Sequence, residues 1–342
     1  ALSGGHFSYI ALIGLLTVAV GISFKIAAFP LHYYAPDVYQ GAATPVTSFL
    51  SFAPKAAGFF ALILVFNLTS WTLSTGNPVD PLPDILLLLA VMTMCLGNML
   101  ALLQRDFKRI MAYSSIAHSG YMLVGLGVGP MVPILSQGIW HSSPGNGVNA
   151  ALFYLGGYSL MTAGVFAVLI YFQGKLGAAE DLDDIAGIAA EHPLAAACMT
   201  VCLFSLIGMP FTVGFLGKLF IVQAALAGGY PIVAVIVVLN AAVAAAYYLR
   251  MIAVMYVRDA WAPFTLRNVW ALKTSAVLAT GLVILFGVFP SVLLSKSTKS
   301  GDAIGLSIQE DYPPPISAKP MKSSTPAKPL VQLTLADHTG TN

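Results

Sequence analysis

The stretch that decides the fold is FKIAAFPLHYYAPDVYQGAATPVTSFLSFAPKAAGFF, residues 24–60, in which lysines and prolines interrupt apolar sequence. Lys25 precedes Pro30 by five residues, and Lys55 follows Pro54 directly. Proline removes a helical hydrogen bond and clashes with the preceding turn, so Pro30 predicts a break in the helix that carries Lys25. We read Pro54 and Lys55 as the beginning of the next helix.

The rest of the chain is equally apolar. Apolar residues make up 58% of the sequence and charged residues only 9%, whereas a soluble domain carries about 25% charged residues. The mean hydropathy is +0.82. We therefore expect an all-α integral membrane protein, a polytopic bundle, and not a soluble enzyme. The net charge of +2 gives no reason to expect a nucleic-acid partner.

Apolar runs of sufficient length predict about eight transmembrane helices, two of them broken. A span needs about 20 mostly apolar residues. The runs lie near residues 8–29, 46–67, 84–104, 110–128, 149–172, 194–222, 230–256 and 271–294. We expect residues 1–295 to form one transmembrane domain and residues 296–342, which are polar and rich in Pro, Lys and Ser, to form a disordered tail.

Basic residues are unevenly shared between the predicted loops. On one side of the membrane the loops hold Arg105, Lys108, Arg109, Lys175, Arg258, Arg267 and Lys273. The opposite connectors, at 68–83, 129–148 and 223–229, hold no lysine or arginine. Short loops rich in Lys and Arg face the cytoplasm, so we expect the start of the chain and the tail on the non-cytoplasmic side.

Apart from Lys273, at the start of the last run, three lysines lie within the predicted spans, where we expect them to be buried: Lys25, Lys55 and Lys218. A lysine at a span centre costs about 2.5–3.5 kcal/mol. The predicted spans hold no acid to neutralise it, except Asp84 at the first position of the run at 84–104. Lys218 follows Pro210 in SLIGMPFTVGFLGKLF, a second predicted break. Transporters build ion sites from ionisable residues beside such breaks, so we favour a proton relay over structural bonding to backbone carbonyls.

Two histidines are candidate relay stations, because imidazole both accepts and donates a proton. His32 lies two residues after Pro30, and His118 lies in the serine-rich YSSIAHSGY. For His118, a core histidine bonded to a serine or a carbonyl is an equal alternative. For Asp37, the nearest acid to the first break, we expect a helix-capping role.

The stretch 24–60 resembles a signature of the antiporter-like membrane subunits of respiratory complex I, NADH-quinone oxidoreductase. Three further blocks agree with that family in order: GNMLALLQRDFKRIMAYSSIAHSGYMLVG (97–125), LFYLGGYSLMTAGVF (152–166) and SLIGMPFTVGFLGKLFI (205–221). The form APDVYQGA followed by PVTSFLS is most similar to the subunit N branch. The resemblance covers roughly residues 8–294.

This resemblance implies an antiporter-like fold and proton translocation by a membrane-arm subunit. It makes Lys25 the central lysine on a broken helix, Lys55 the connecting lysine, and Lys218 the lysine on a second broken helix toward the exit. His32 and His118 match histidines in the family's PLH and SSIxH motifs. Family members have further helices, bearing an essential glutamate and its paired lysine, so we expect this chain to be a C-terminal portion.

The resemblance also implies that the chain belongs to a translocase but carries no redox centre, cofactor or metal. NADH, FMN, iron–sulfur clusters and quinone would belong to partner subunits. The expected partners are the lipid bilayer and other complex I membrane subunits, especially antiporter-like subunit M and small subunit K, in a bacterial inner membrane. Two alternatives remain: an Mrp-type cation/proton antiporter subunit, and a structural fragment that does not pump.

Overall fold

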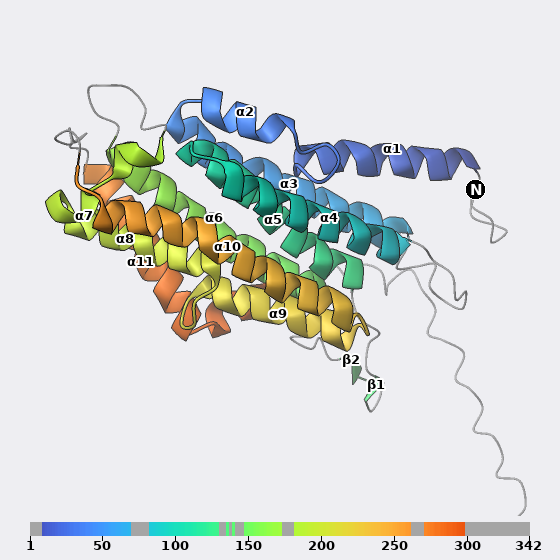
Figure 1. Ribbon diagram of the computed structural model, residues 1–342. Helices are drawn as coiled ribbons and strands as arrows, with labels where there is room; N and C mark the ends of the chain where they lie inside the picture. The colour runs from blue at the N-terminus through green and yellow to red at the C-terminus, as the bar shows by residue number, and fades with distance from the viewer. Residues whose placement is uncertain are drawn as a thin grey trace, which may run out of the picture.

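The chain folds into a bundle of helices that pack side by side with broadly aligned axes (Figure 1). Apart from one pair of two-residue strands, the regular structure in the described part of the chain is helical. The computed structural model describes residues 9–69, 82–129, 135–136, 139–140, 147–172, 181–260 and 270–297. The expectation of a disordered tail falls outside these residues for positions 298–342.

Five described helices are long and apolar enough to cross a membrane: α3 (Thr44–Thr69), α4 (Leu82–Leu103), α6 (Gly147–Tyr171), α10 (Pro231–Val257) and α11 (Trp270–Val288). The other helical elements are α1 (Tyr9–Lys25), α2 (Tyr34–Gly41), α5 (Phe107–Val128), η1 (Leu182–Ile185), α7 (Ile188–Glu191), α8 (Pro193–Ile207) and α9 (Val213–Ala227). Residues 291–297 are also helical. The two strands, β1 (Leu135–Ser136) and β2 (Ile139–Trp140), pair antiparallel. The count of eight spans remains a prediction.

Helix α6 forms the centre of the bundle. Within the apolar part of α6, 72% of the residues are buried, compared with 17% in α11 at the periphery. Peripheral helices turn large apolar side chains such as Phe49, Leu88 and Leu103 outward. A soluble protein rarely exposes so much contiguous apolar surface, whereas in lipid such a surface is solvated by the acyl chains.

The helical pattern is interrupted at the two predicted breaks. Helix α1 ends at Lys25 and α2 begins at Tyr34, while α8 ends at Ile207 and α9 begins at Val213. Each interruption contains a residue other than glycine with positive φ, Ala27 in the first and Phe211 in the second. Such conformations are uncommon outside glycine and cluster at functional sites. The predicted single run at 194–222 is therefore two helices.

Backbone groups released at the interruptions are bonded to side chains of the protein. In the first, the Phe29 N–H donates to Thr93 Oγ1 of α4 at 3.0 Å. At the second, the Gly214 N–H donates to Ser205 Oγ at 3.1 Å. Irregular backbone is tolerated at membrane depth only when it is buried in protein or lines a wet cavity. These two bonds give the freed backbone groups partners within the protein, as the first condition requires.

One end of the bundle gathers the charged connectors, at the left of Figure 1 where α7 and the start of α5 lie. The Leu182 N–H of η1 donates to the Arg105 carbonyl at 3.1 Å. Arg258, at the end of α10, forms an ion pair with Asp183. The predicted grouping of basic residues therefore holds for the described connectors, while Lys175 and Arg267 lie outside the described residues.

Four expectations about local structure were wrong. Lys108 and Arg109 are not in a loop: α5 starts at Phe107, and Lys108 is 2% exposed. Pro54 does not begin a helix but lies inside α3. Residues 223–227 of a predicted connector continue α9. Asp37 caps no helix, because it lies within the first turn of α2 and pairs with Arg109 instead.

Candidate functional site

Lys55 is a buried, hydrogen-bonded lysine inside the helix bundle. It lies on α3, one residue after Pro54, and is 3% exposed. Its Nζ donates to Ser119 Oγ of α5 at 2.8 Å and to the Ser115 carbonyl. Because a buried ammonium must be hydrogen-bonded to be tolerated, these acceptors explain how an apolar helix accommodates Lys55.

Ser119 joins Lys55 to the first interruption. Its hydroxyl oxygen accepts from Lys55, and its O–H faces the Ile26 carbonyl at 3.0 Å and the Ser115 carbonyl at 3.2 Å. Ile26 directly follows Lys25. The lysine of α3 is therefore one serine away from the backbone at which α1 ends.

Lys25 itself is exposed, so its predicted burial was wrong for the described chain. The reason is tertiary: α1 lies at the edge of the bundle, as Figure 1 shows, so the bundle covers only part of its surface. Lys25 and Lys55 nevertheless line one cavity of about 340 Å³, together with Tyr39 and Ser115. The Tyr39 hydroxyl lies 3.1 Å from Ser115 Oγ. A shared cavity brings the first two predicted lysines together.

Lys218 is buried at the second interruption. It lies on α9, and its Nζ donates to the Leu206 and Ile207 carbonyls at 2.8 and 2.7 Å. The last carbonyls of a helix lack intrahelical partners and carry the negative end of the helix dipole. The end of α8 therefore supplies acceptors and favourable potential to the ammonium.

Gly208 makes this arrangement possible. It ends α8 with φ +96°, and a Cβ placed there would lie 3.2 Å from Lys218 Cδ. Positive φ is readily adopted by glycine, since it has no Cβ. The break thus depends on Gly208 as well as on Pro210, the residue from which we predicted it.

His118 lies between tyrosines of two other helices. Its Nδ1 is 2.6 Å from the Tyr154 hydroxyl of α6, and its Nε2 is 3.1 Å from the Tyr248 hydroxyl of α10. Ser114 also bonds Tyr248. The imidazole therefore bonds phenols, and not the serine or carbonyl of the alternative considered above. With both ring nitrogens engaged, His118 can take up a proton on one side and release it on the other.

Aromatic rings separate His118 from each buried lysine. Toward α3, the Tyr158 ring lies 5.0 Å from the His118 ring, and Lys55 Nζ lies 5.6 Å from the Tyr158 ring centroid. Toward α9, the Tyr121 ring lies 5.6 Å from His118, and Lys218 Nζ lies 5.2 Å from the Tyr121 centroid. His118 is thus the middle member of a layer that contacts Lys55 on one side and Lys218 on the other.

Buried amides hold the tyrosine layer. Asn98 Nδ2 donates to the Tyr121 hydroxyl at 3.1 Å and to Asn240 Oδ1 at 3.1 Å, while the Tyr247 hydroxyl donates to Asn98 Oδ1 at 3.1 Å. These residues come from α4, α5 and α10. A satisfied buried polar network fixes the relative positions of its members, so it orients the Tyr121 ring beside Lys218.

The structure does not bring His32 into this group. Its Nδ1 is buried without a hydrogen-bond partner among the described residues, and its ring lies 6.0 Å from Phe29. No group of three or more metal-ligating side chains occurs in the described ranges. Lys55, His118 and Lys218 are therefore connected through the tyrosine layer, and Lys25 shares a cavity with Lys55. His32 has no such contact among the described residues.

Sequence analysis missed Lys108 as a buried residue. Its Nζ donates to the Ala42 carbonyl at 3.1 Å, just beyond α2. Helical spacing could have indicated its burial. Ser115 lies seven residues after Lys108, and Ser119 lies four residues after Ser115, so the three share a face of α5. Tyr154 and Tyr248 gave no comparable signal, because their contacts with His118 span 36 and 130 positions.

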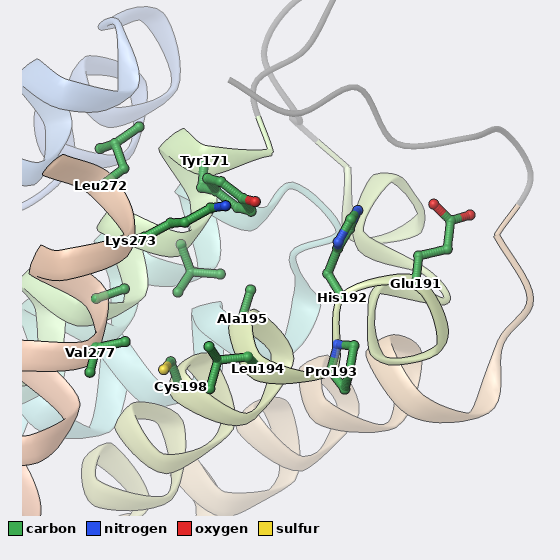
Figure 2. A pocket seen from close by; sticks show the side chains of 12 residues that line it. Tyr171, Glu191, His192, Pro193, Leu194, Ala195, Cys198, Leu272, Lys273 and Val277 are labelled. Carbon is green, nitrogen blue, oxygen red and sulfur yellow. The ribbon is translucent and has the colours of Figure 1, made fainter. Parts of the chain in front are cut away.

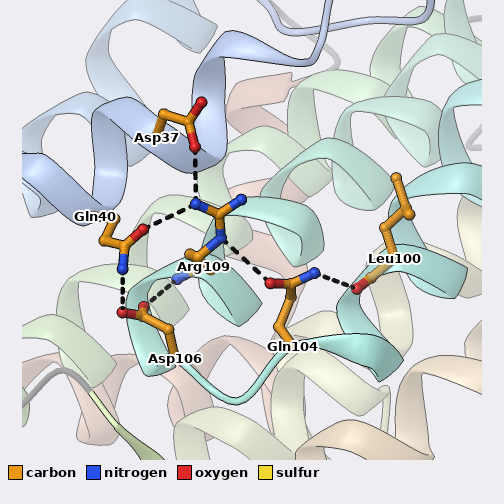
Figure 3. A network of polar contacts seen from close by, with 6 residues as sticks. All are labelled: Asp37, Gln40, Leu100, Gln104, Asp106 and Arg109. Atoms are coloured by element: carbon orange, nitrogen blue, oxygen red, sulfur yellow. Dashed lines mark hydrogen bonds and ion pairs between the residues drawn. The ribbon is translucent and has the colours of Figure 1, made fainter.

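Arg109 provides a second anchor for α2, shown in Figure 3. Its Nη1 donates to Asp37 Oδ1 at 2.7 Å and to Gln40 Oε1 at 2.8 Å, and its Nε donates to Gln104 Oε1 at 3.2 Å. Gln40 in turn donates to Asp106 Oδ2 at 3.0 Å. The connector between α4 and α5 and the first turn of α5 therefore fix the short helix that follows the first interruption.

Comparison with known proteins shows the family of the chain. The model of the family described as "NADH:quinone oxidoreductase/Mrp antiporter, TM" matches residues 2–244. The chain belongs to this family. The antiporter-like fold and the resemblance to complex I membrane subunits are thereby confirmed.

Within this NADH:quinone oxidoreductase/Mrp antiporter family, the chain is 36% identical over 306 residues to "NADH-quinone oxidoreductase subunit N" of Rhodospirillum rubrum. The match covers 89% of the chain and 58% of that relative, so the chain spans little more than half of the relative's length. A chain of respiratory complex I from Thermus thermophilus superimposes with a TM-score of 0.69 at 31% identity, covering 86% of this chain and 61% of that one.

A chain of the Mrp complex from Dietzia sp. superimposes with a TM-score of 0.75 at 18% identity, covering 88% of this chain and 61% of that one. Identity this low shows the fold alone. The similarity in sequence favours subunit N over the Mrp branch of the family.

Proposed function

We propose that this chain belongs to a proton-translocating membrane-arm subunit of NADH-quinone oxidoreductase, in which buried lysines and His118 relay protons. The observation that carries the proposal is the position of His118 in a tyrosine layer that contacts Lys55 on one side and Lys218 on the other. Intramembrane ionisable residues are costly and mark ion or proton pathways. The subunit N relatives support the choice of complex.

The relay begins in the cavity shared by Lys25 and Lys55. A proton that reaches Lys55 is held as an ammonium by Ser119 and the Ser115 carbonyl. Lys25 and Lys55 line the same cavity, and like charges that share a site disfavour each other's charged form. A charge arriving on Lys25 would therefore push the proton of Lys55 toward the tyrosine layer.

His118 would take the next step, with the Tyr154 and Tyr248 hydroxyls orienting its two nitrogens. Lys218 would receive the proton at the end of α8, where the Leu206 and Ile207 carbonyls stabilise its ammonium. We keep His32 as an additional station next to the first interruption, supported by its place in the family motif and by an Nδ1 atom with no described partner.

The proposal includes an arrangement in the membrane. We take α1 with α2, and α8 with α9, as two broken spans, which with α3, α4, α5, α6, α10 and α11 make eight. Residues 1–295 would form the membrane domain and 296–342 a tail. The charged end of the bundle would face the cytoplasm of a bacterial inner membrane, with the chain's start and tail opposite, by the positive-inside rule.

Redox chemistry is assigned to other subunits in this proposal. NADH, FMN, iron–sulfur clusters and quinone would be bound there, and this chain would carry no redox centre. Its neighbours would be subunits M and K together with lipid. The chain's own contribution is to hold and move protons at Lys25, Lys55, His118 and Lys218.

The test is to purify the tagged chain from its native membrane and to assay the complex that accompanies it. We expect NADH:quinone oxidoreductase activity in that complex, and NADH-driven proton uptake by inside-out vesicles. Lys218→Ala should reduce proton uptake while the complex still assembles. Arg258→Gln is the matched control, because Arg258 is basic but exposed and lies outside the tyrosine layer.

Proton uptake in the Lys218→Ala complex equal to that of the unmodified complex would refute the relay. Co-purification with subunits of a cation/proton antiporter, with uptake driven by a sodium gradient and not by NADH, would instead support the Mrp alternative. Absence of either activity in every preparation would support a structural fragment.

A further inference from the structure

A cavity of about 240 Å³ opens at the charged end of the bundle, away from the proposed relay. The end of α6, the start of α8 and the first turns of α11 enclose it (Figure 2). Its wall is mainly apolar, from residues such as Val168, Leu194, Ala276 and Val277, while Lys273, Tyr171, His192 and Glu191 supply polar atoms. The cavity therefore has one polar end and one apolar wall.

The cation of this cavity is Lys273. Its Nζ lies 5.4 Å from the Tyr171 ring centroid, and in Figure 2 its side chain extends toward that ring. Lys273 is exposed, one turn into α11, and the helix begins at Trp270, which is 80% exposed. Exposed tryptophan beside lysine is typical of the depth of lipid headgroups.

The acid of the cavity is turned away from this cation. In Figure 2 the Glu191 carboxylate lies on the far side of the His192 ring from Lys273. The His192 ring lies 5.7 Å from the Phe172 ring. An anion beside Lys273 would therefore meet the ammonium first and the carboxylate only at a greater separation.

The apolar wall opens toward the outside of the bundle. Leu194, which lines the cavity, is 70% exposed, and Val277 is also exposed. Cys198, one helical turn after Leu194, is buried and lines the cavity from α8. Because α11 is the most exposed of the five long apolar helices, lipid chains can reach this groove from the side.

We propose that this cavity binds an anionic phospholipid, with the headgroup phosphate at Lys273 and an acyl chain along Leu194, Cys198 and Val277. The argument for this occupant is charge complementarity at headgroup depth together with an apolar groove that continues it. Basic pockets between transmembrane helices bind anionic headgroups in this way. The proposal does not depend on the proton relay.

Native mass spectrometry of the purified full chain tests the site, with phosphatidylglycerol and phosphatidylcholine of identical acyl chains as probes. We expect more phosphatidylglycerol than phosphatidylcholine to be retained. Lys273→Gln should reduce that preference about fivefold, the effect of one basic residue at an anionic surface. Glu191→Gln should increase it, and Arg258→Gln, at the same end but outside the cavity, should leave it unchanged.

Cys198 gives a second, local measurement. In vesicles, a membrane-permeant maleimide should alkylate Cys198 more slowly when phosphatidylglycerol is present than in pure phosphatidylcholine. The slowing should disappear in Lys273→Gln, while alkylation of Cys95, which lies outside the cavity, should not respond to the lipid.

Equal lipid preference in Lys273→Gln and the unmodified chain would overturn the proposal. So would a loss of preference in Arg258→Gln as large as in Lys273→Gln, because the effect would then be general surface charge. Protection of Cys198 that appears only in an assembled complex, and equally in both lipids, would show that a protein surface covers the cavity instead.

Discussion

Lys55 Nζ donates to Ser119 Oγ at 2.8 Å, and the same serine lies 3.0 Å from the Ile26 carbonyl. One hydroxyl thus bonds the buried cation of α3 and the backbone at the end of α1. Hydrogen bonds to charged groups contribute more than neutral ones, and leaving a buried partner unsatisfied costs still more. Ser119 should therefore matter more than a typical serine in a membrane helix.

Ser119→Ala should lower the free energy of unfolding by about 1–3 kcal/mol, because Lys55 and the Ile26 carbonyl both lose a partner. Unfolding of the full chain by SDS titration in mixed micelles measures this. Ser159→Ala is the control, since among the described residues the Ser159 hydroxyl bonds only the Gly156 carbonyl of its own helix, at 2.6 Å. Equal losses in the two variants would contradict a bridging role for Ser119.

Gly208→Ala should destabilise the second interruption. With φ +96° at this position, an alanine costs about 1–2 kcal/mol in backbone energy, and its Cβ would crowd the Lys218 side chain. The same SDS titration detects the loss. Under the proposed function, proton pumping by the assembled complex should fall as well, because the carbonyls that hold Lys218 would shift.

Gly281→Ala serves as the matched control for this change. Gly281 lies within α11, and a Cβ added there would meet nothing within 4 Å. Alanine in a helix interior is favoured over glycine by about 0.5–1 kcal/mol, so we expect Gly281→Ala to be neutral or stabilising. A Gly208→Ala variant as stable as Gly281→Ala would show that the φ of Gly208 is not required.

The sequence predicted where the helices break but not how the breaks are held. Pro30 and Pro210 marked both interruptions, because proline disrupts a helix through its own covalent geometry. The hydrogen bond from Phe29 to Thr93 spans 64 positions, and no local pattern encodes such a pairing. Membrane character was likewise predictable, since composition alone separates lipid from water as solvent.

Burial of individual charges was harder to predict than their position in a span. Lys25, Lys55 and Lys218 occupy similar apolar sequence, yet Lys25 is exposed and the other two are buried. The difference depends on which helices pack against each face, and that is a tertiary property. Lys108 shows the converse, because a lysine counted as a loop residue is buried against the end of α2.

The contacts of His118 predict energetic coupling to its two tyrosines. Tyr154→Phe removes the hydroxyl at Nδ1 and should cost about 1 kcal/mol of stability. In a His118→Phe background the same change should cost much less, because its partner is gone, and the double-mutant cycle should give a coupling of about 0.5–3 kcal/mol. Tyr248→Phe should couple to His118 in the same way through Nε2.

Tyr33→Phe is the control for these cycles, because Tyr33 is 67% exposed and lies at the start of α2, outside the tyrosine layer. It should show no coupling to His118. If Tyr154→Phe cost the same in both backgrounds, the hydroxyl would act independently of the imidazole, and Tyr154 would not be the residue that orients His118 in the proposed relay.

Arg109 and Asp37 should contribute very unequally to stability, although they form one ion pair (Figure 3). The Asp37 side chain is 73% exposed, and exposed ion pairs contribute about 0–1 kcal/mol. Asp37→Asn should therefore change unfolding little. Arg109→Gln also removes donors to Gln40 and Gln104, so it should cost about 1–3 kcal/mol.

Ionic strength distinguishes the stability that comes from the Arg109–Asp37 ion pair from the stability that comes from the Arg109 bonds to Gln40 and Gln104. An exposed charge pair is screened as ionic strength rises, so the small effect of Asp37→Asn should vanish in a high-salt titration. The effect of Arg109→Gln should persist there, because its bonds to Gln40 and Gln104 join a cation to neutral amides in a partly buried site. If high salt abolished both effects, Arg109 would hold α2 by charge attraction alone, and its contacts with Gln40 and Gln104 would carry no stability.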